Sequence, residues 1–86
     1  MEVSRAVTQM RALGDPVRWS IVGELRTSTR SARVLADAVE VSPTLLSHHL
    51  KVLCQAGLVV SARRGRWIDY TVDREALAAL AGTLSA

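Results

Sequence analysis

The hydrophobic pattern of the chain changes period at Gly57, and this change limits the folds open to it. Before Gly57, the leucines of the segment 43–56 recur every three or four residues, as they do on one face of a helix. From Trp67 to Val72, apolar and polar residues alternate, which is typical of a strand. Between the apolar runs, RRGR at 63–66 predicts a tight turn, because glycine tolerates a positive φ. The sequence therefore predicts a helix followed directly by a two-stranded hairpin.

Further helices are predicted before and after this unit. A helix-start signal, a capping side chain followed by proline, occurs at Asp15-Pro16 and again at Ser42-Pro43. The predicted helices cover, in chain order, residues 2–12, 16–26, 32–39, 43–56 and 74–84. The third and fourth are joined by a short turn and form a helix-turn-helix unit. We predict a mainly α winged helix-turn-helix fold of order α-α-α-α-β-β-α, as one domain over residues 1–86.

The small size of the chain points to self-association. A domain of 86 residues buries only about 60–65% of the surface that its unfolded chain exposes, so its core is thin. Such chains commonly gain apolar burial by forming oligomers. The first and last predicted helices carry apolar stripes, and the candidate residues of a homodimer interface are Val3, Val7, Met10, Leu77, Leu80 and Leu84.

Positive charge is concentrated around the predicted hairpin. The chain has a formal net charge of +3. Residues 43–68 include Lys51, Arg63, Arg64 and Arg66 but no acidic residue. A local positive surface attracts a phosphate backbone. Charge alone does not distinguish such a contact from a solvated basic face.

Polar residues in the 43–56 segment occupy positions that its leucines leave free. The expected buried face contains Leu46, Leu50 and Leu53. Thr44, Ser47, His48 and Lys51 are spaced by three, four or seven residues, so they share another face. Hydroxyl and imidazole groups can bond base edges, and an ammonium group suits phosphate. The pattern indicates a DNA-recognition helix, with an ordinary solvated face as the alternative.

Four stretches of the chain resemble the ArsR/SmtB family of metal-sensing transcriptional repressors. They are ALGDPVR at 12–18, SHHLKVL at 47–53, AGLV at 56–59 and GRWIDY at 65–70. The resemblance implies a dimeric bacterial repressor whose first and last helices form the interface and whose operator is released when an inducer binds. It also implies DNA contacts by Thr44, Ser47, His48 and Lys51, with His49 adjoining, and by Arg63, Arg64 and Arg66 at the wing tip.

The family's metal ligands are missing from the matching positions. The third predicted helix has no cysteine, and the last contains no histidine. Cys54 is the single cysteine, and we expect it to pack as a small apolar residue near the base of the wing. His48 and His49 are adjacent on a helix and point about 100° apart, so one ion does not easily bind both. His49 is interpreted as a partly buried histidine bonded to backbone or to a carboxylate.

The means of sensing stays open at this point. An atypical site of nitrogen and oxygen ligands, built across the dimer, would suit a divalent metal such as nickel or zinc. A separate partner protein that supplies the sensing is the other alternative.

Several other classes of protein are disfavoured. No Ser/His/Asp or Cys/His set and no phosphate loop is recognisable, and Asp15 and Asp73 are explained as helix caps, so we do not expect an enzyme. A single cysteine fits the reducing cytoplasm, and no apolar run reaches the roughly 18 residues of a membrane span. A winged-helix module that binds protein rather than DNA is the competing interpretation.

Overall fold

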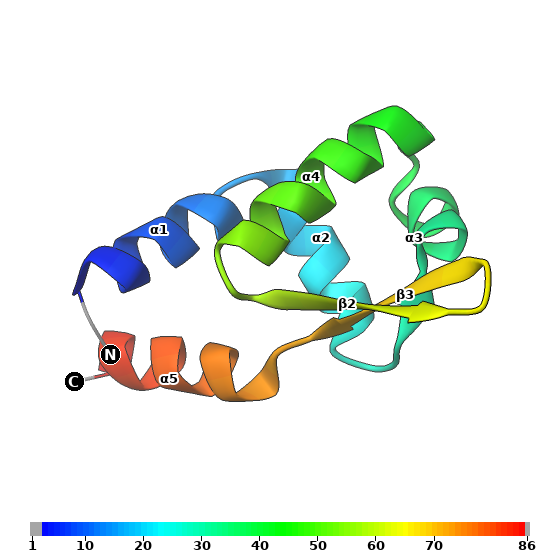
Figure 1. Ribbon diagram of the computed structural model, residues 1–86. Helices are drawn as coiled ribbons and strands as arrows, with labels where there is room; N and C mark the ends of the chain where they lie inside the picture. Colours follow the sequence, from blue (N-terminus) through cyan, green and yellow to red (C-terminus); the bar gives the residue numbers. More distant parts are fainter. Residues whose placement is uncertain (1–2, 86) are drawn as a thin grey trace.

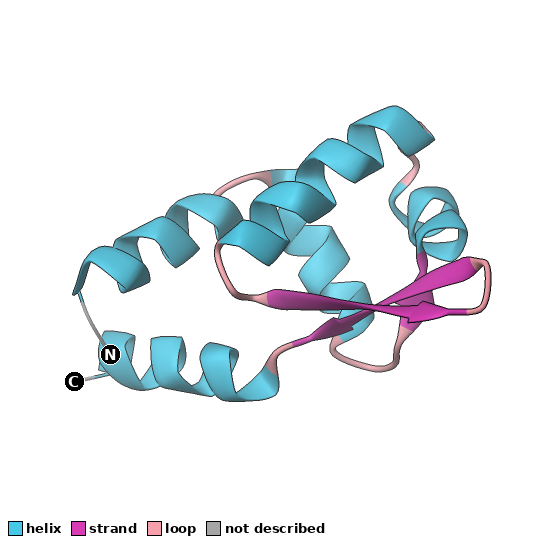
Figure 2. Ribbon diagram, in the orientation of Figure 1, coloured by secondary structure: helices cyan, strands magenta, loops and turns pink. Residues whose placement is uncertain are grey.

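The structure, a computed structural model, describes residues 3–85. Its elements are α1 (Val3–Leu13), α2 (Pro16–Leu25), β1 (Arg30–Ser31), α3 (Ala32–Val39), α4 (Pro43–Gln55), β2 (Val59–Arg64), β3 (Trp67–Val72) and α5 (Arg74–Ser85). The helix-turn-helix unit is α3–α4, and the β2–β3 hairpin that follows is the wing (Figures 1 and 2). The predicted mainly helical, winged fold is confirmed.

The helix starts form as the capping signals predict. The Asp15 carboxylate accepts hydrogen bonds from the backbone N–H groups of Val17 and Arg18, at 2.9 and 3.1 Å. The Ser42 hydroxyl accepts one from the N–H of Leu45 at 3.1 Å. Each cap satisfies amides that have no partner within the first turn of a helix. The residue at which α4 begins is therefore determined by side chains next to it. The same start determines which residues of α4 share a face.

The sheet has one strand more than the sequence predicts. Within residues 3–85 its order is β1-β3-β2, and both pairings are antiparallel. In β1, Arg30 pairs with Tyr70 of β3. The wing turn is also shorter than expected, because Arg64 pairs with Trp67, which leaves two residues between the strands. Gly65, with φ 62°, provides the left-handed conformation that this turn requires.

One hydrophobic cluster lies between α2, α3, α4 and the sheet. Its least exposed members are Ile21, Leu25, Leu35, Leu46, Leu53 and Leu58. Helix α1 is attached to the end of α4 by the buried Gln9, whose Nε2 donates to the carbonyl of Ala56 at 3.0 Å. None of the helices within residues 3–85 combines the length and apolar character that a membrane span requires.

Candidate nucleic-acid interface

Helix α4 separates its leucines from its polar side chains. Leu46, Leu50 and Leu53 are buried in the core cluster. The candidate recognition residues of this helix are all exposed to solvent: Thr44, Ser47, His48 and Lys51. The helix therefore presents hydroxyl, imidazole and ammonium groups outward, as a recognition helix must.

The wing carries its arginines beyond the core. Arg63 and Arg66 are exposed, and Figure 1 shows the hairpin turn at the same end of the molecule as the N-terminal end of α4. Arg64 donates to Asp69 through Nε at 2.7 Å and Nη2 at 3.2 Å. These hydrogen bonds lower the pKa of Asp69 and raise that of Arg64. Arg64 is thus paired with Asp69 on the wing, but its side chain, like those of Arg63 and Arg66, stays exposed to solvent.

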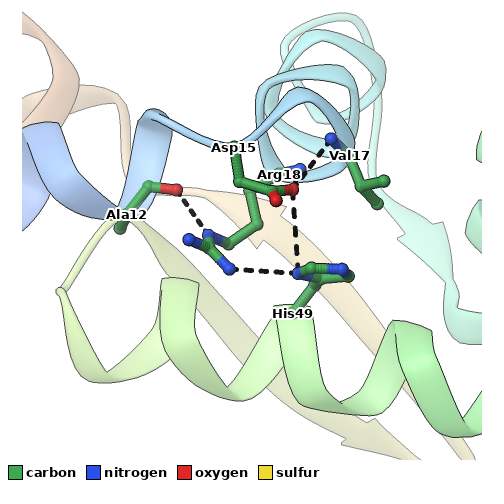
Figure 3. A network of polar contacts seen from close by, with 5 residues as sticks. All are labelled: Ala12, Asp15, Val17, Arg18 and His49. Carbon is green, nitrogen blue, oxygen red and sulfur yellow. Dashed lines mark hydrogen bonds and ion pairs between the residues drawn. The ribbon is translucent and has the colours of Figure 1, made fainter.

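His49 does not belong with the exposed residues of α4. It is only 6 % exposed and faces the start of α2, where Nη1 of Arg18 lies 3.1 Å from its Nδ1 (Figure 3). Because a guanidinium can only donate, Nδ1 is the acceptor, and a neutral His49 carries its proton on Nε2. Oδ2 of Asp15 lies 3.9 Å from Nδ1, which is too long for a hydrogen bond and becomes an ion pair only if the ring is protonated.

The inclusion of His49 among the DNA contacts is therefore wrong for its side chain, and the structural interpretation is the better one. Its main partner is a guanidinium rather than a backbone group or a carboxylate. Nothing in the sequence pattern singles out Arg18 for this role, although it is the last residue of the ALGDPVR stretch. A contact across 31 positions depends on the tertiary fold.

Asp15 is the acidic member of this network. The N–H of Arg18 has the largest effect in holding the pKa of the Asp15 carboxyl below its ordinary value; burial opposes this, while the N–H of Val17 and the charges of Arg18 and His49 add to it. A carboxyl whose pKa is lower in the folded state stabilises that state above its unfolded pKa. This contribution is lost as the pH falls through the folded pKa.

Asp15→Asn should remove this acid dependence while keeping the cap, since asparagine caps helices about as well as aspartate. We expect the free energy of unfolding of the wild type to fall toward that of the variant as the pH is lowered from about 6 to about 3. Urea titrations at each pH measure both proteins. A difference between them that stays constant over the range would contradict the assignment.

The residues considered as metal ligands do not fit a site within one chain. Among residues 3–85, no three His, Cys, Asp or Glu side chains come together. Cys54 packs against the core cluster, as expected, and burial raises the pKa of its thiol, which disfavours the thiolate that a metal needs. The ring centroids of His48 and His49 are 5.3 Å apart, and Nδ1 of His49 is engaged by Arg18.

The candidate dimer residues fall into two groups. Val3, Val7, Met10 and Leu84 are exposed, so apolar surface of α1 and α5 is uncovered in the single chain. Leu80, by contrast, is buried within the chain, and Leu77 is half-buried. Helices α1 and α5 lie at the same end of the molecule, opposite the wing turn (Figure 1).

Comparison with known proteins agrees with this architecture. The family described as "Helix-turn-helix domain" matches residues 13–62, more than half of the chain. The HTH-type transcriptional repressor SmtB of Mycobacterium tuberculosis is 45% identical over 69 residues, which are 80% of this chain and 51% of that protein. The chain thus spans about half the length of this relative.

Two solved structures extend the similarity to nearly the whole chain. An ArsR-like transcriptional regulator from Rhodococcus sp. RHA1 superposes with a TM-score of 0.87 at 35% identity, over 95% of this chain and 77% of that one. A homodimeric winged helix-turn-helix DNA-binding domain from Mycobacterium bovis gives 0.84 at 25% identity, over 96% and 77%. These are regulators of transcription, not enzymes. The chain belongs to the ArsR/SmtB family of winged helix-turn-helix transcriptional regulators.

Proposed function

We propose that this protein is a transcriptional repressor that binds its operator as a homodimer, with α4 in the major groove and the wing against the adjacent backbone. The observation that carries the proposal is the division of α4 into a buried leucine face and an outward face of Thr44, Ser47, His48 and Lys51. A helix of this kind, next to a cationic hairpin, can combine base contacts with phosphate contacts.

The names of the relatives support both repression and DNA binding as a homodimer. The Mycobacterium tuberculosis protein is a repressor, and the Mycobacterium bovis domain is homodimeric and binds DNA. A symmetric dimer presents two copies of α4 to two half-sites about one helical turn of DNA apart. A bacterial repressor of this kind acts on chromosomal DNA and therefore works in the cytoplasm.

Substitutions on the outward face of α4 test this assignment. Lys51→Ala should weaken binding to all DNA sequences and lower the slope of log K against log salt by about 0.9 per half-site, because one phosphate contact is lost. Ser47→Ala and His48→Ala should instead reduce the preference for the operator over random DNA, by about 1–3 kcal/mol per lost base contact. Gel shifts with the gene's own upstream region, at several salt concentrations, measure both quantities.

Arg26→Gln is the matched control, because it removes an exposed cation near the end of α2. It should leave the slope and the operator preference unchanged. If Lys51→Ala, Ser47→Ala and His48→Ala all weakened random DNA equally, the protein would be a nonspecific binder. If no DNA bound in a salt-dependent manner, the competing interpretation as a protein-binding module would replace the repressor.

The inducer is a separate part of the proposal. A divalent metal such as nickel or zinc would need nitrogen and oxygen ligands from both protomers, because the described residues of one chain gather no group of three. Counting the ions bound per dimer in a titration with each metal tests this arrangement. A dimer that binds no metal would point to a different inducer or to a partner protein that supplies the sensing.

A further inference from the structure

A cavity of about 280 Å³, open to solvent on one side, lies at the end of α4 away from the Ser42 cap and is lined by residues of α1, α2 and α4. This volume equals the share of about nine water molecules in the liquid, so a small hydrated ion fits inside. Two arginines line it, Arg11 from α1 and Arg18 from α2, together with the polar side chains of Thr8 and Gln55. No aspartate or glutamate is among the described residues of its lining.

The guanidinium of Arg18 is held in place before any ligand arrives. Its Nε donates to the carbonyl of Ala12 at 2.6 Å, and its Nη1 lies 3.1 Å from Nδ1 of His49 (Figure 3). A guanidinium has five N–H donors, so these two contacts leave three for a ligand. A side chain that is already fixed loses little conformational entropy on binding, which favours affinity.

The positive charge of the cavity is not neutralised from within. Arg11 is exposed and forms no ion pair with residues 3–85. Asp15 acts on Arg18 electrostatically, but it does not line the cavity, and its Oδ2 accepts from the amides of Val17 and Arg18. Two arginines that line one cavity, with no acidic residue beside them in the lining, favour an anion with several oxygen atoms.

We propose that this cavity is a binding site for an oxyanion, a phosphate, sulfate or carboxylate group, held between Arg11 and Arg18. Arg18 also contacts His49 in the helix that carries Ser47 and His48. The site is therefore joined to the recognition helix both by this contact and directly, through Val52 and Gln55 of α4 in its lining, a position suited to an effector. The oxyanion comes either from a free small molecule or from the backbone of bound DNA, and two measurements separate these sources.

Titration of the free protein with inorganic phosphate at constant ionic strength, followed by NMR, tests the first source. We expect saturable shifts of the Arg18 Nε–H and His49 ring signals at one phosphate per chain. Arg11→Gln should weaken binding at least about tenfold, which is the effect of losing one charge-assisted contact. Arg26→Gln, which removes an equal charge outside the cavity, should change the phosphate affinity by less than about twofold.

The salt dependence of DNA binding tests the second source. If a DNA phosphate fills the cavity, free phosphate does not saturate it, and Arg11→Gln lowers the salt slope by about 0.9 per half-site while Arg26→Gln does not. The proposal is overturned if phosphate gives no saturable shift and the two variants have equal slopes, or if both weaken phosphate binding equally. The phosphate titration uses no DNA, so its outcome is independent of whether the protein is a repressor.

Discussion

Leu50→Ala should lower the free energy of unfolding by about 2–5 kcal/mol, whereas Lys51→Ala, one residue further along α4, should change it by less than about 0.5 kcal/mol. Leu50 is 2 % exposed and lies in the core cluster, so its truncation removes apolar contacts and leaves a cavity. Lys51 is exposed. Urea denaturation followed by circular dichroism measures both, at one protein concentration because a dimer's stability depends on it.

The DNA affinities of the same two variants should follow the opposite order. Lys51→Ala loses a phosphate contact at full stability, while Leu50→Ala, assayed where it remains folded, keeps every outward side chain of α4. One variant should therefore lose stability and the other DNA affinity, which is expected only if these neighbouring residues lie on different faces of the helix. Equal losses of stability in the two variants would contradict the orientation of α4 on which the proposed function depends.

The orientation of α4 could be predicted because local signals determine it. Ser42 caps the helix, Pro43 occupies its first position, and leucines spaced by three or four residues fix which side is buried. The same reasoning gives α2, whose start at Asp15-Pro16 has the same form. Signals of this kind operate within a few residues and need no knowledge of the tertiary structure.

The features that the sequence did not predict depend on partners far along the chain. Strand β1 has only two residues and exists because it pairs with Tyr70 and Asp69 of β3. The wing turn is shorter than predicted because the arginines before Gly65 extend β2 by cross-strand pairing, and a run of arginines has no alternating pattern. For His49, burial could be predicted, but not the partner, since Arg18 lies on another helix.

The apolar stripe of α1 leads to the second large effect. The helix turns Ala6, Gln9 and Ala12 toward the rest of the chain and leaves Val3, Val7 and Met10 outside. We expect Val7→Asp to weaken the homodimer at least about a hundredfold, because an unpaired carboxylate would be buried where apolar surfaces meet. The single chain should remain folded, since Val7 is not part of the core cluster. Sedimentation equilibrium measures the dissociation constant of the dimer, and circular dichroism shows whether the chain remains folded.

Ser20→Asp is the control, because it introduces the same charge at an exposed residue of α2, outside the stripe and outside the lining of the cavity. It should leave the dimer intact, and equal dissociation of both variants would show that the stripe is not the interface.

Loss of the dimer should also abolish tight operator binding, although the recognition residues of Val7→Asp are unchanged. In the proposed complex each α4 contacts one half-site, and a linked pair gains about 10²–10⁴ in affinity over a single domain because the second contact is intramolecular. A Val7→Asp monomer that still bound the full operator as tightly as the wild type would therefore contradict both the interface and the need for two recognition helices.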